Sequence, residues 1–195
     1  MWDQRYSSSA YLYGTEPNEF LRAQVQCLPP GRVLCLADGE GRNGVWLAEQ
    51  GYQVTSVDAS VVGIGKTRQL AESRRVSVDA VHADLADFDL GEGQWDAVIS
   101  IFCHLPLPLR RDLHARVRKA LKPGGVLLLE AYTPAQLALG TGGPPVADLM
   151  MDLAALQAEF MGMEVLHSVE TEREVIEGEG HFGVGAVVQL IARKP

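Results

Sequence analysis

Short apolar runs alternate with amphipathic segments along most of the chain. Residues 33–36 and 94–102 are apolar runs beside turn-forming or polar residues, as is typical of buried strands. Further strands are expected at 53–57, 76–80 and 126–132, the last apolar enough to be covered on both faces. Because helical segments separate these strands, the pattern predicts an α/β fold with a doubly wound, Rossmann-like sheet that is mostly parallel.

The helices are expected at 43–50, 60–73, 109–121 and 149–160. In the last two, apolar residues recur every three or four positions, which places them on one face. Gly51 can end the first helix in a left-handed conformation, and Ser60 can cap the second. The β-rich runs 163–175 and 183–192 have no helix between them, so they are expected to pair as an antiparallel hairpin.

Composition and charge narrow the possible partners. The 195 residues suffice for one domain with a single core. A formal net charge of −8 disfavours nucleic acids, whose phosphates attract lysine and arginine. No apolar run approaches the roughly 18 residues of a membrane span, and the three cysteines follow no metal-binding or redox pattern. We therefore expect a cytoplasmic protein, monomeric or homodimeric, with a small-molecule substrate, no metal and no membrane partner.

The loop after the first strand, 37–44, reads ADGEGRNG, and its glycines have the G-x-G-x-x-G spacing of a dinucleotide-binding turn. Asp38 and Glu40 oppose an anionic pyrophosphate there, because like charges repel, and Arg42 compensates only in part. A cofactor with an ammonium and a sulfonium suits these carboxylates better, while its own carboxylate can use the helix N–H groups near Asn43. S-adenosylmethionine combines these groups, and S-adenosylhomocysteine is its demethylated product.

Three further strand ends carry residues that suit an adenosine cofactor. Asp58 ends the second strand, where an acidic residue accepts hydrogen bonds from ribose hydroxyls. Asp84 follows the third strand and can hold the adenine amino group, with the backbone N–H of Leu85 on the ring. Ile101 and Phe102, at the end of the fourth strand, can pack on the adenine or the methionine chain. Together the loops predict one ligand site at the carboxyl ends of the strands.

The ordered set of motifs VLCLADGEGRN, Asp58, ADL and LKPGG resembles class I S-adenosylmethionine-dependent methyltransferases over nearly the whole chain. The GRN after the glycine loop, with YLYGTEPNEFL at 11–21, resembles the small bacterial methyltransferases of the tellurite-resistance and thiol methyltransferase group. The resemblance implies a seven-stranded sheet, with six parallel strands and one antiparallel strand in the C-terminal hairpin. Cys35 stands where the family usually has an acidic residue, and Ala37 where it has glycine, so Asp38 or Glu40 is expected to take over the ammonium contact.

The resemblance also implies a division of the chain and a set of cofactor contacts. The expected parts are an N-terminal arm and helix over the site (1–30), a cofactor-binding core (31–132), and a lid loop, helix and hairpin (133–195). The expected cofactor contacts are Ala37, Asp38, Gly39, Glu40, Gly41, Arg42, Asn43, Asp58, Ala59, Asp84, Leu85, Ile101, Phe102 and Tyr13.

For in-line methyl transfer, the protein chiefly has to align the acceptor with the methyl group and exclude water from the site. A thiolate needs no general base once ionised, whereas oxygen and nitrogen nucleophiles more often do, so a thiol or chalcogen compound is one expected acceptor. His104, after the fourth strand, and His181, in the hairpin connection, are the candidate bases, and Tyr11 is a third candidate catalytic residue. The N-terminal tyrosines can close over the cofactor and exclude water, with 139–145 as a lid.

Each of these residues also has a structural interpretation. His104 can be a core histidine, the hairpin connection an exposed tip, Asp58 a helix cap, Asp84 a strand-end turn, and the tyrosines an arm packed on the domain. Two other functions stay open. An NAD(P)-dependent reductase would share the glycine loop and Asp58, but the loop carboxylates and the lack of a Tyr-x-x-x-Lys pair speak against it. A non-catalytic adenosylmethionine-binding protein needs no base at all.

Overall fold

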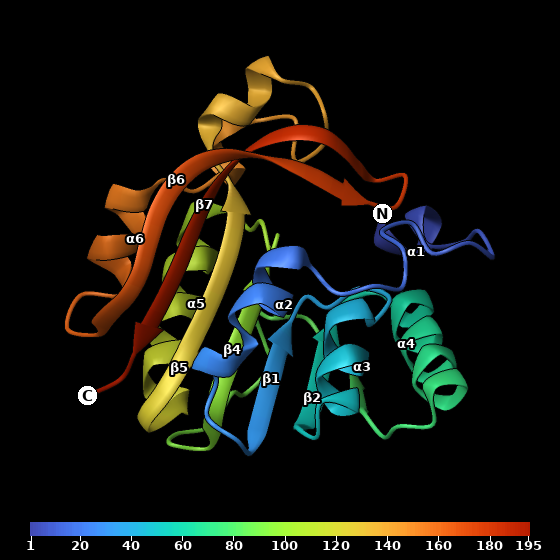
Figure 1. The fold of residues 1–195 in the computed structure, drawn as a ribbon, viewed down its shortest axis with the longest axis horizontal. Helices are drawn as coiled ribbons and strands as arrows, with labels where there is room; N and C mark the ends of the chain where they lie inside the picture. The colour runs from blue at the N-terminus through green and yellow to red at the C-terminus, as the bar shows by residue number, and fades with distance from the viewer.

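Seven strands form one sheet in the order β3-β2-β1-β4-β5-β7-β6 (Figure 1). The computed structural model describes all residues, 1–195. The strands are β1 (Arg32–Leu36), β2 (Gln53–Asp58), β3 (Asp79–His82), β4 (Trp95–Ile101), β5 (Leu121–Tyr132), β6 (Glu164–Glu177) and β7 (His181–Arg193). Strands β1 to β5 pair in parallel, and β7 is antiparallel to both β5 and β6. The expected α/β fold, with six parallel strands and one antiparallel strand in a hairpin, is confirmed.

Helices cover both faces of the sheet. They are α1 (Trp2–Arg5), α2 (Glu19–Gln24), α3 (Arg42–Glu49), α4 (Val61–Arg74), α5 (Leu107–Ala120) and α6 (Leu153–Glu159), with short 3-10 turns η1 (Val25–Cys27), η2 (Pro134–Ala138) and η3 (Ala147–Leu149). Along β1, Val33 and Cys35 pack with α2 and α3, while Leu34 and Leu36 pack with α5 and α6. A strand buried on both faces explains why its sequence is a continuous apolar run.

Three predicted element boundaries were wrong. Strand β5 begins at Leu121 and not at residue 126, because Leu121 already pairs with Trp95 and KPGG lies within the strand. The other two errors lie at helix ends. Strand β3 begins at Asp79, because Arg75 adopts a left-handed φ of 58° and the Val76 N–H still bonds to Ala71 at the end of α4. Helix α6 begins only at Leu153, after the cap Asp152, whose side chain accepts a hydrogen bond from the Ala155 N–H. At both helix ends, apolar residues continue into the neighbouring turn. Apolar spacing alone therefore does not show where the helix begins or ends.

Ala37 adopts a left-handed φ of 48°, at the position where the family usually has glycine. A residue with a side chain costs about 1–2 kcal/mol in this conformation. Glycine avoids that strain, but its greater conformational freedom in the unfolded chain offsets part of the gain in stability. We expect Ala37→Gly to raise the free energy of unfolding by about 0.5–1 kcal/mol in urea titrations. The matched control Ala115→Gly, on the exposed face of α5, should lower it by about 1 kcal/mol. A loss of stability in Ala37→Gly would contradict the strained conformation.

Candidate active site

The strand order reverses between β1 and β4, and the glycine loop leaves β1 at this point. Asp38 in the loop is buried, and its Oδ2 accepts hydrogen bonds from Ser56 Oγ at 2.8 Å and from the Gly44 N–H at 3.1 Å. A Cβ at Gly44 would lie 2.5 Å from this oxygen, so the contact requires glycine. Burial raises the pKa of Asp38 to about 7. The carboxyl group therefore ties the loop to β2 and α3, and this oxygen is not available to an ammonium.

Glu40, the second loop carboxylate, is also buried and also has protein partners. Its Oε1 lies 2.6 Å from Lys66 Nζ, and its Oε2 accepts a hydrogen bond from the Leu12 N–H at 2.8 Å. Lys66 Nζ in turn donates to the Ala10 carbonyl at 2.8 Å, and the Tyr11 hydroxyl donates to the Lys66 carbonyl. Glu40 thus anchors the N-terminal arm to α4. Tyr11 is held beside α4 by the same contacts.

Asp58 lies beside the glycine loop at the end of β2. Its two oxygens accept hydrogen bonds from the Gly39 and Ser60 N–H groups, both at 2.8 Å, and burial raises its pKa. The Tyr6 ring of the arm covers this place, since a Cβ at Gly39 would lie 2.7 Å from the Tyr6 hydroxyl. Asp3 in α1 accepts a hydrogen bond from Ser60 Oγ at 2.5 Å, which fastens the arm at the start of α4. Figure 1 shows α1 above the strand ends, beside α4.

The other expected adenine contacts occupy the ends of β3 and β4. The Asp84 side chain accepts a hydrogen bond from the Ala86 N–H at 2.9 Å, as in a strand-end turn. Leu85 and Ile101 are buried and pack in the two main cores. Ala59 is exposed and accepts a hydrogen bond from the His82 ring at 3.0 Å through its carbonyl.

Five rings gather where β4, β5 and β7 meet the arm, and we name them the aromatic cluster: Tyr13, Phe102, His104, Tyr132 and His181. The Phe102 centroid lies 4.6 Å from that of Tyr132 and 4.7 Å from that of His181. Phe102 adopts a left-handed φ of 51°, which is strained for a bulky residue and which the surrounding packing must hold. Such strain gathers at functional sites, so Phe102 marks this strand end as a candidate site.

His104 has both ring nitrogens occupied by the backbone. Nδ1 lies 2.9 Å from the Leu149 carbonyl, and Nε2 accepts a hydrogen bond from the Tyr132 N–H at 3.3 Å. Burial lowers the pKa of His104 to about 4, so the ring is neutral. It joins the loop after β4 to the end of β5 and to η3. This arrangement leaves no nitrogen free to accept a substrate proton, so the expected role as a base is corrected to a structural one.

His181 differs from His104 because only one of its nitrogens has a protein partner. Its Nδ1 lies 3.5 Å from Glu177 Oε2, while Nε2 makes no hydrogen bond within the protein. Burial lowers its pKa although Glu177 opposes the shift. The ring centroid lies 4.5 Å from that of Tyr13, and the Gly180 N–H donates to the Leu12 carbonyl at 3.0 Å. The hairpin tip is therefore packed against the arm and does not stand free in solvent.

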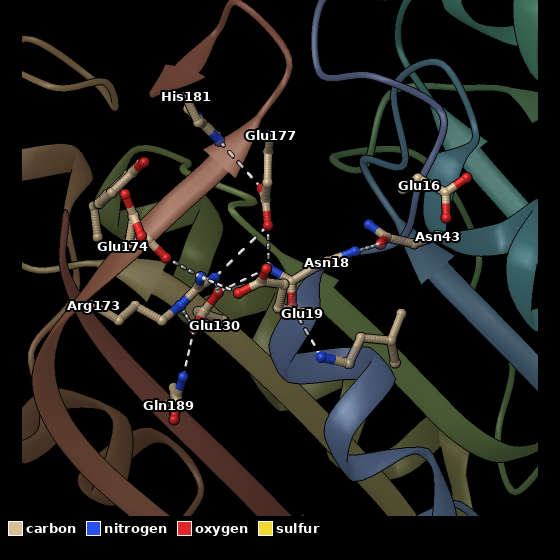
Figure 2. A network of polar contacts seen from close by, with 12 residues as sticks. Glu16, Asn18, Glu19, Asn43, Glu130, Arg173, Glu174, Glu177, His181 and Gln189 are labelled. Carbon is tan, nitrogen blue, oxygen red and sulfur yellow. Dashed lines mark hydrogen bonds and ion pairs between the residues drawn. The ribbon is translucent and has the colours of Figure 1, made fainter. Parts of the chain in front are cut away.

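A buried polar network holds His181 in place (Figure 2). Glu177 receives hydrogen bonds from Arg42 at 2.6 Å and from the Asn18 side chain at 2.8 Å. His181 and Arg42 together outweigh the effect of burial and lower the pKa of Glu177 to about 2. Arg42 begins α3 directly after the glycine loop, and the neighbouring Asn43 side chain accepts a hydrogen bond from the Asn18 N–H. The network thus connects the glycine loop to the histidine on the hairpin.

Glu130 forms the second half of the network and was missed by the sequence patterns. It is fully buried on β5 and receives hydrogen bonds from Arg173, from Gln189 at 2.6 Å and from Asn18 at 2.8 Å. In Figure 2 the Arg173 side chain points between Glu130 and Glu177. The one signal in the sequence was a lone carboxylate in an apolar strand, VLLLEAY. A buried carboxylate requires partners, but the sequence does not reveal which ones.

Comparison with known proteins identifies the central part of the chain. Residues 33–125 match the family described as a methyltransferase domain. This part of the chain is a methyltransferase domain. The resemblance to class I S-adenosylmethionine-dependent methyltransferases that the motifs predicted is confirmed.

Curated proteins from several bacteria are similar in sequence to this chain. Putative methyltransferase YqeM of Bacillus subtilis is 29% identical over 140 residues, which cover 70% of this chain and 56% of that protein. The tRNA 5-carboxymethoxyuridine methyltransferase of Escherichia coli is 33% identical over 104 residues, 52% of this chain and 40% of that protein. The chain spans about half the length of the curated relatives it matches.

Solved structures share the fold of the whole chain. TehB from Haemophilus influenzae has a TM-score of 0.73 at 20% identity, covering 100% of this chain and 66% of that one. A protein solved in work on the conversion of a disulfide bond into a thioacetal group during echinomycin biosynthesis has a TM-score of 0.79 at 21% identity, covering 99% and 90%. No helix of the chain is long and apolar enough to span a membrane.

Open space lies at the opposite edge of the sheet from the aromatic cluster. A groove of about 500 Å³ is lined by Arg32, Tyr52, Val54 and Asp79, at the amino ends of β1 to β3. Ligands of doubly wound sheets bind at the carboxyl ends, so we do not assign this groove to the methyltransferase site. At the carboxyl ends, the arm covers the glycine loop.

Proposed function

We propose that the protein transfers the methyl group of S-adenosylmethionine to a small-molecule acceptor, a thiol or chalcogen compound, by in-line displacement. The observation that carries this proposal is the position of His181, whose free Nε2 belongs to the aromatic cluster at the ends of β4 and β5. One of the two structural neighbours described above comes from work on the conversion of a disulfide bond into a thioacetal, which supports a sulfur acceptor by analogy. The chain is similar to both in fold alone.

The residues at the strand ends fit such a cofactor. The buried carboxylate of Asp58 has only two backbone N–H partners, so it has oxygen lone pairs left for ribose hydroxyls. We assign the adenine to the ends of β3 and β4, near Asp84, Leu85 and Ile101. Aromatic rings suit a sulfonium because of cation–π attraction, and Phe102 and Tyr13 are placed to supply them. Since Tyr6 covers Gly39, the arm has to move when the cofactor enters.

Each residue near the reacting atoms has a defined task. Bound S-adenosylmethionine supplies an electrophilic methyl group. His181 takes the proton of the acceptor at Nε2, and Glu177 accepts a hydrogen bond from Nδ1–H and so holds the tautomer that this requires. Arg42 and Asn18 keep Glu177 ionised and in position. The arm, closed over the site, excludes water from the transfer.

Charge favours a small acceptor over nucleic acid. The E. coli relative is named for a tRNA, but this chain carries a formal net charge of −8 and offers no excess of cations for phosphates. All three cysteines are unpaired, which is consistent with the reducing cytoplasm we propose as its location.

Isothermal titration calorimetry with S-adenosylhomocysteine, S-adenosylmethionine and NADH tests the choice of cofactor. We expect the two adenosyl compounds to bind and NADH not to bind, because residues 33–125 match a methyltransferase domain. Binding of NADH alone would replace the proposal with the reductase alternative.

Asp58→Ala should weaken S-adenosylmethionine binding by about 1.5–3 kcal/mol, since a hydrogen bond to a charged group contributes about that much. The same titrations measure this as a dissociation constant about 10- to 150-fold higher. Asp112→Ala, on the exposed side of α5, is the matched control and should bind as the wild type does. Equal affinities in both variants would remove Asp58 from the cofactor site.

A further inference from the structure

The Tyr132 hydroxyl is the one buried side-chain polar atom in the chain without a hydrogen-bond partner. Tyr132 ends β5, and its side chain is fully buried. A buried hydroxyl without a partner is costly, and native proteins rarely keep one without a reason. Both ring nitrogens of the neighbouring His104 have hydrogen-bond partners.

The ring of Tyr132 is fixed, so the hydroxyl cannot turn away to find a partner. It stacks on Phe102 with centroids 4.6 Å apart. Two glycines leave room for it, since a Cβ at Gly143 would lie 2.7 Å from the ring and one at Gly185 would lie 2.9 Å from it. The Tyr132 backbone N–H is bound to His104. The position of the hydroxyl is therefore determined by three neighbouring segments: the loop after β4, the 139–145 loop and β7.

The hydroxyl and the candidate base His181 approach the same small space. Their rings are perpendicular, with centroids 5.2 Å apart. A Cβ at Gly142, in the 139–145 loop, would lie 3.3 Å from the Tyr132 hydroxyl and 3.0 Å from His181 Cδ2, the carbon next to Nε2. These distances are shorter than ordinary van der Waals contacts, so the 139–145 loop has to move aside before a small group can contact both residues. Burial raises the pKa of Tyr132 well above its usual value, so the hydroxyl keeps its proton and can donate it in a hydrogen bond.

We propose that the Tyr132 hydroxyl binds the methyl acceptor by donating a hydrogen bond to its nucleophilic atom, within the proposed function on which this assignment rests. The acceptor is then a small thiol whose sulfur lies between Tyr132 and His181. Its S–H proton passes to His181 Nε2. A sulfur lone pair forms the new bond to the methyl carbon, and the electrons of the broken bond stay on the cofactor sulfur. Tyr132 neither gains nor loses a proton. Its hydrogen bond positions the sulfur and stabilises the thiolate.

Tyr132→Phe removes only this oxygen, and kinetics with thiophenol as the probe test its role. We expect the KM for thiophenol to rise about tenfold, with kcat changed less and the dissociation constant of S-adenosylmethionine unchanged. The matched control Tyr52→Phe removes a hydroxyl bonded to backbone carbonyls at the opposite edge of the sheet, and should leave the KM unchanged. The melting temperature of Tyr132→Phe should equal or exceed that of the wild type, because an unpartnered hydroxyl is lost.

Three results would overturn the assignment: an unchanged KM for thiophenol, a clear drop in melting temperature, or weaker S-adenosylmethionine binding with unchanged KM, which would place the hydroxyl on the cofactor.

If the wild type methylates no thiol, the proposed acceptor class fails, and a binding experiment then tests the role of Tyr132. The probe is the absorbance change of 4-nitrothiophenol added to the adenosylhomocysteine complex. A change present in the wild type and lost in Tyr132→Phe supports the subsite, and no change in the wild type overturns it.

Discussion

Replacing Glu130 with alanine should lower the free energy of unfolding by about 3–5 kcal/mol, because one partner of a buried ion pair is removed and the other is left without compensation. Arg173 would lose its main carboxylate and keep only Glu177 at 3.7 Å and the exposed Glu19 at 3.7 Å. The side-chain amide of Gln189 would lose its carboxylate acceptor, and that of Asn18 would lose one of its two carboxylate acceptors. Few single substitutions on this chain remove so many buried contacts at once.

Urea unfolding of Glu130→Ala, Arg173→Ala and the double variant measures the interaction as a double-mutant cycle. We expect the double variant to be less destabilised than the sum of the two single variants, since it leaves no unpaired charge. Glu164→Ala breaks the exposed pair with Arg193 and is the control, with an expected effect below about 1 kcal/mol. Additive effects in the cycle would show that Glu130 and Arg173 do not stabilise the fold through each other.

Replacing His181 with glutamine should lower kcat by about 10²- to 10⁴-fold for an acceptor that must lose a proton, the usual contribution of a general base. An aliphatic thiol is such an acceptor at neutral pH, because its pKa lies near 8.5. Thiophenol is more acidic, and a larger ionised fraction should make its loss smaller. The control His167→Gln changes a histidine on β6 whose contact is Gln189, and should keep the wild-type kcat. Equal losses for both thiols would argue against proton transfer by His181.

The pH dependence of the same reaction follows from the shifted pKa of His181. Burial lowers this pKa below 6.5, so the neutral, proton-accepting form predominates before neutral pH is reached. The kcat/KM for the aliphatic thiol, which stays protonated over this range, should therefore rise with pH, level off below pH 7, and lose this lower limb in His181→Gln. An unchanged limb in the variant would assign the titration to another group.

The sequence predicted most of the fold because its strands and helices have different apolar patterns. Val33 to Leu36 are a short, continuous apolar run, since the strand is buried on both faces, whereas the apolar positions of α5 recur every three or four residues. The pattern failed at 76–78, where the left-handed Arg75 turns the chain back onto α4 before β3 begins. Apolar spacing alone does not show where a helix ends if the following turn is also apolar.

The role of a site residue could be predicted from the sequence only where its position at the end of a strand suggests that role. Asp58 was placed at the end of β2 in this way, and its contact with a ribose stays a prediction. The roles of Asp38 and Glu40 could not be predicted, because their partners Ser56 and Lys66 lie 18 and 26 residues away and become neighbours only in the folded chain. The missing hydrogen bond of Tyr132 has no trace in the sequence at all.

Transfer of a labelled methyl group tests the central claim most directly. The wild-type protein is incubated with S-adenosylmethionine labelled at the methyl carbon and with thiophenol, hydrosulfide and an aliphatic thiol, and the products are analysed by mass spectrometry. The account predicts a labelled methyl thioether from at least one thiol, with an equal amount of S-adenosylhomocysteine. Cofactor binding without a labelled product from any of these acceptors would contradict the proposed thiol methyltransferase.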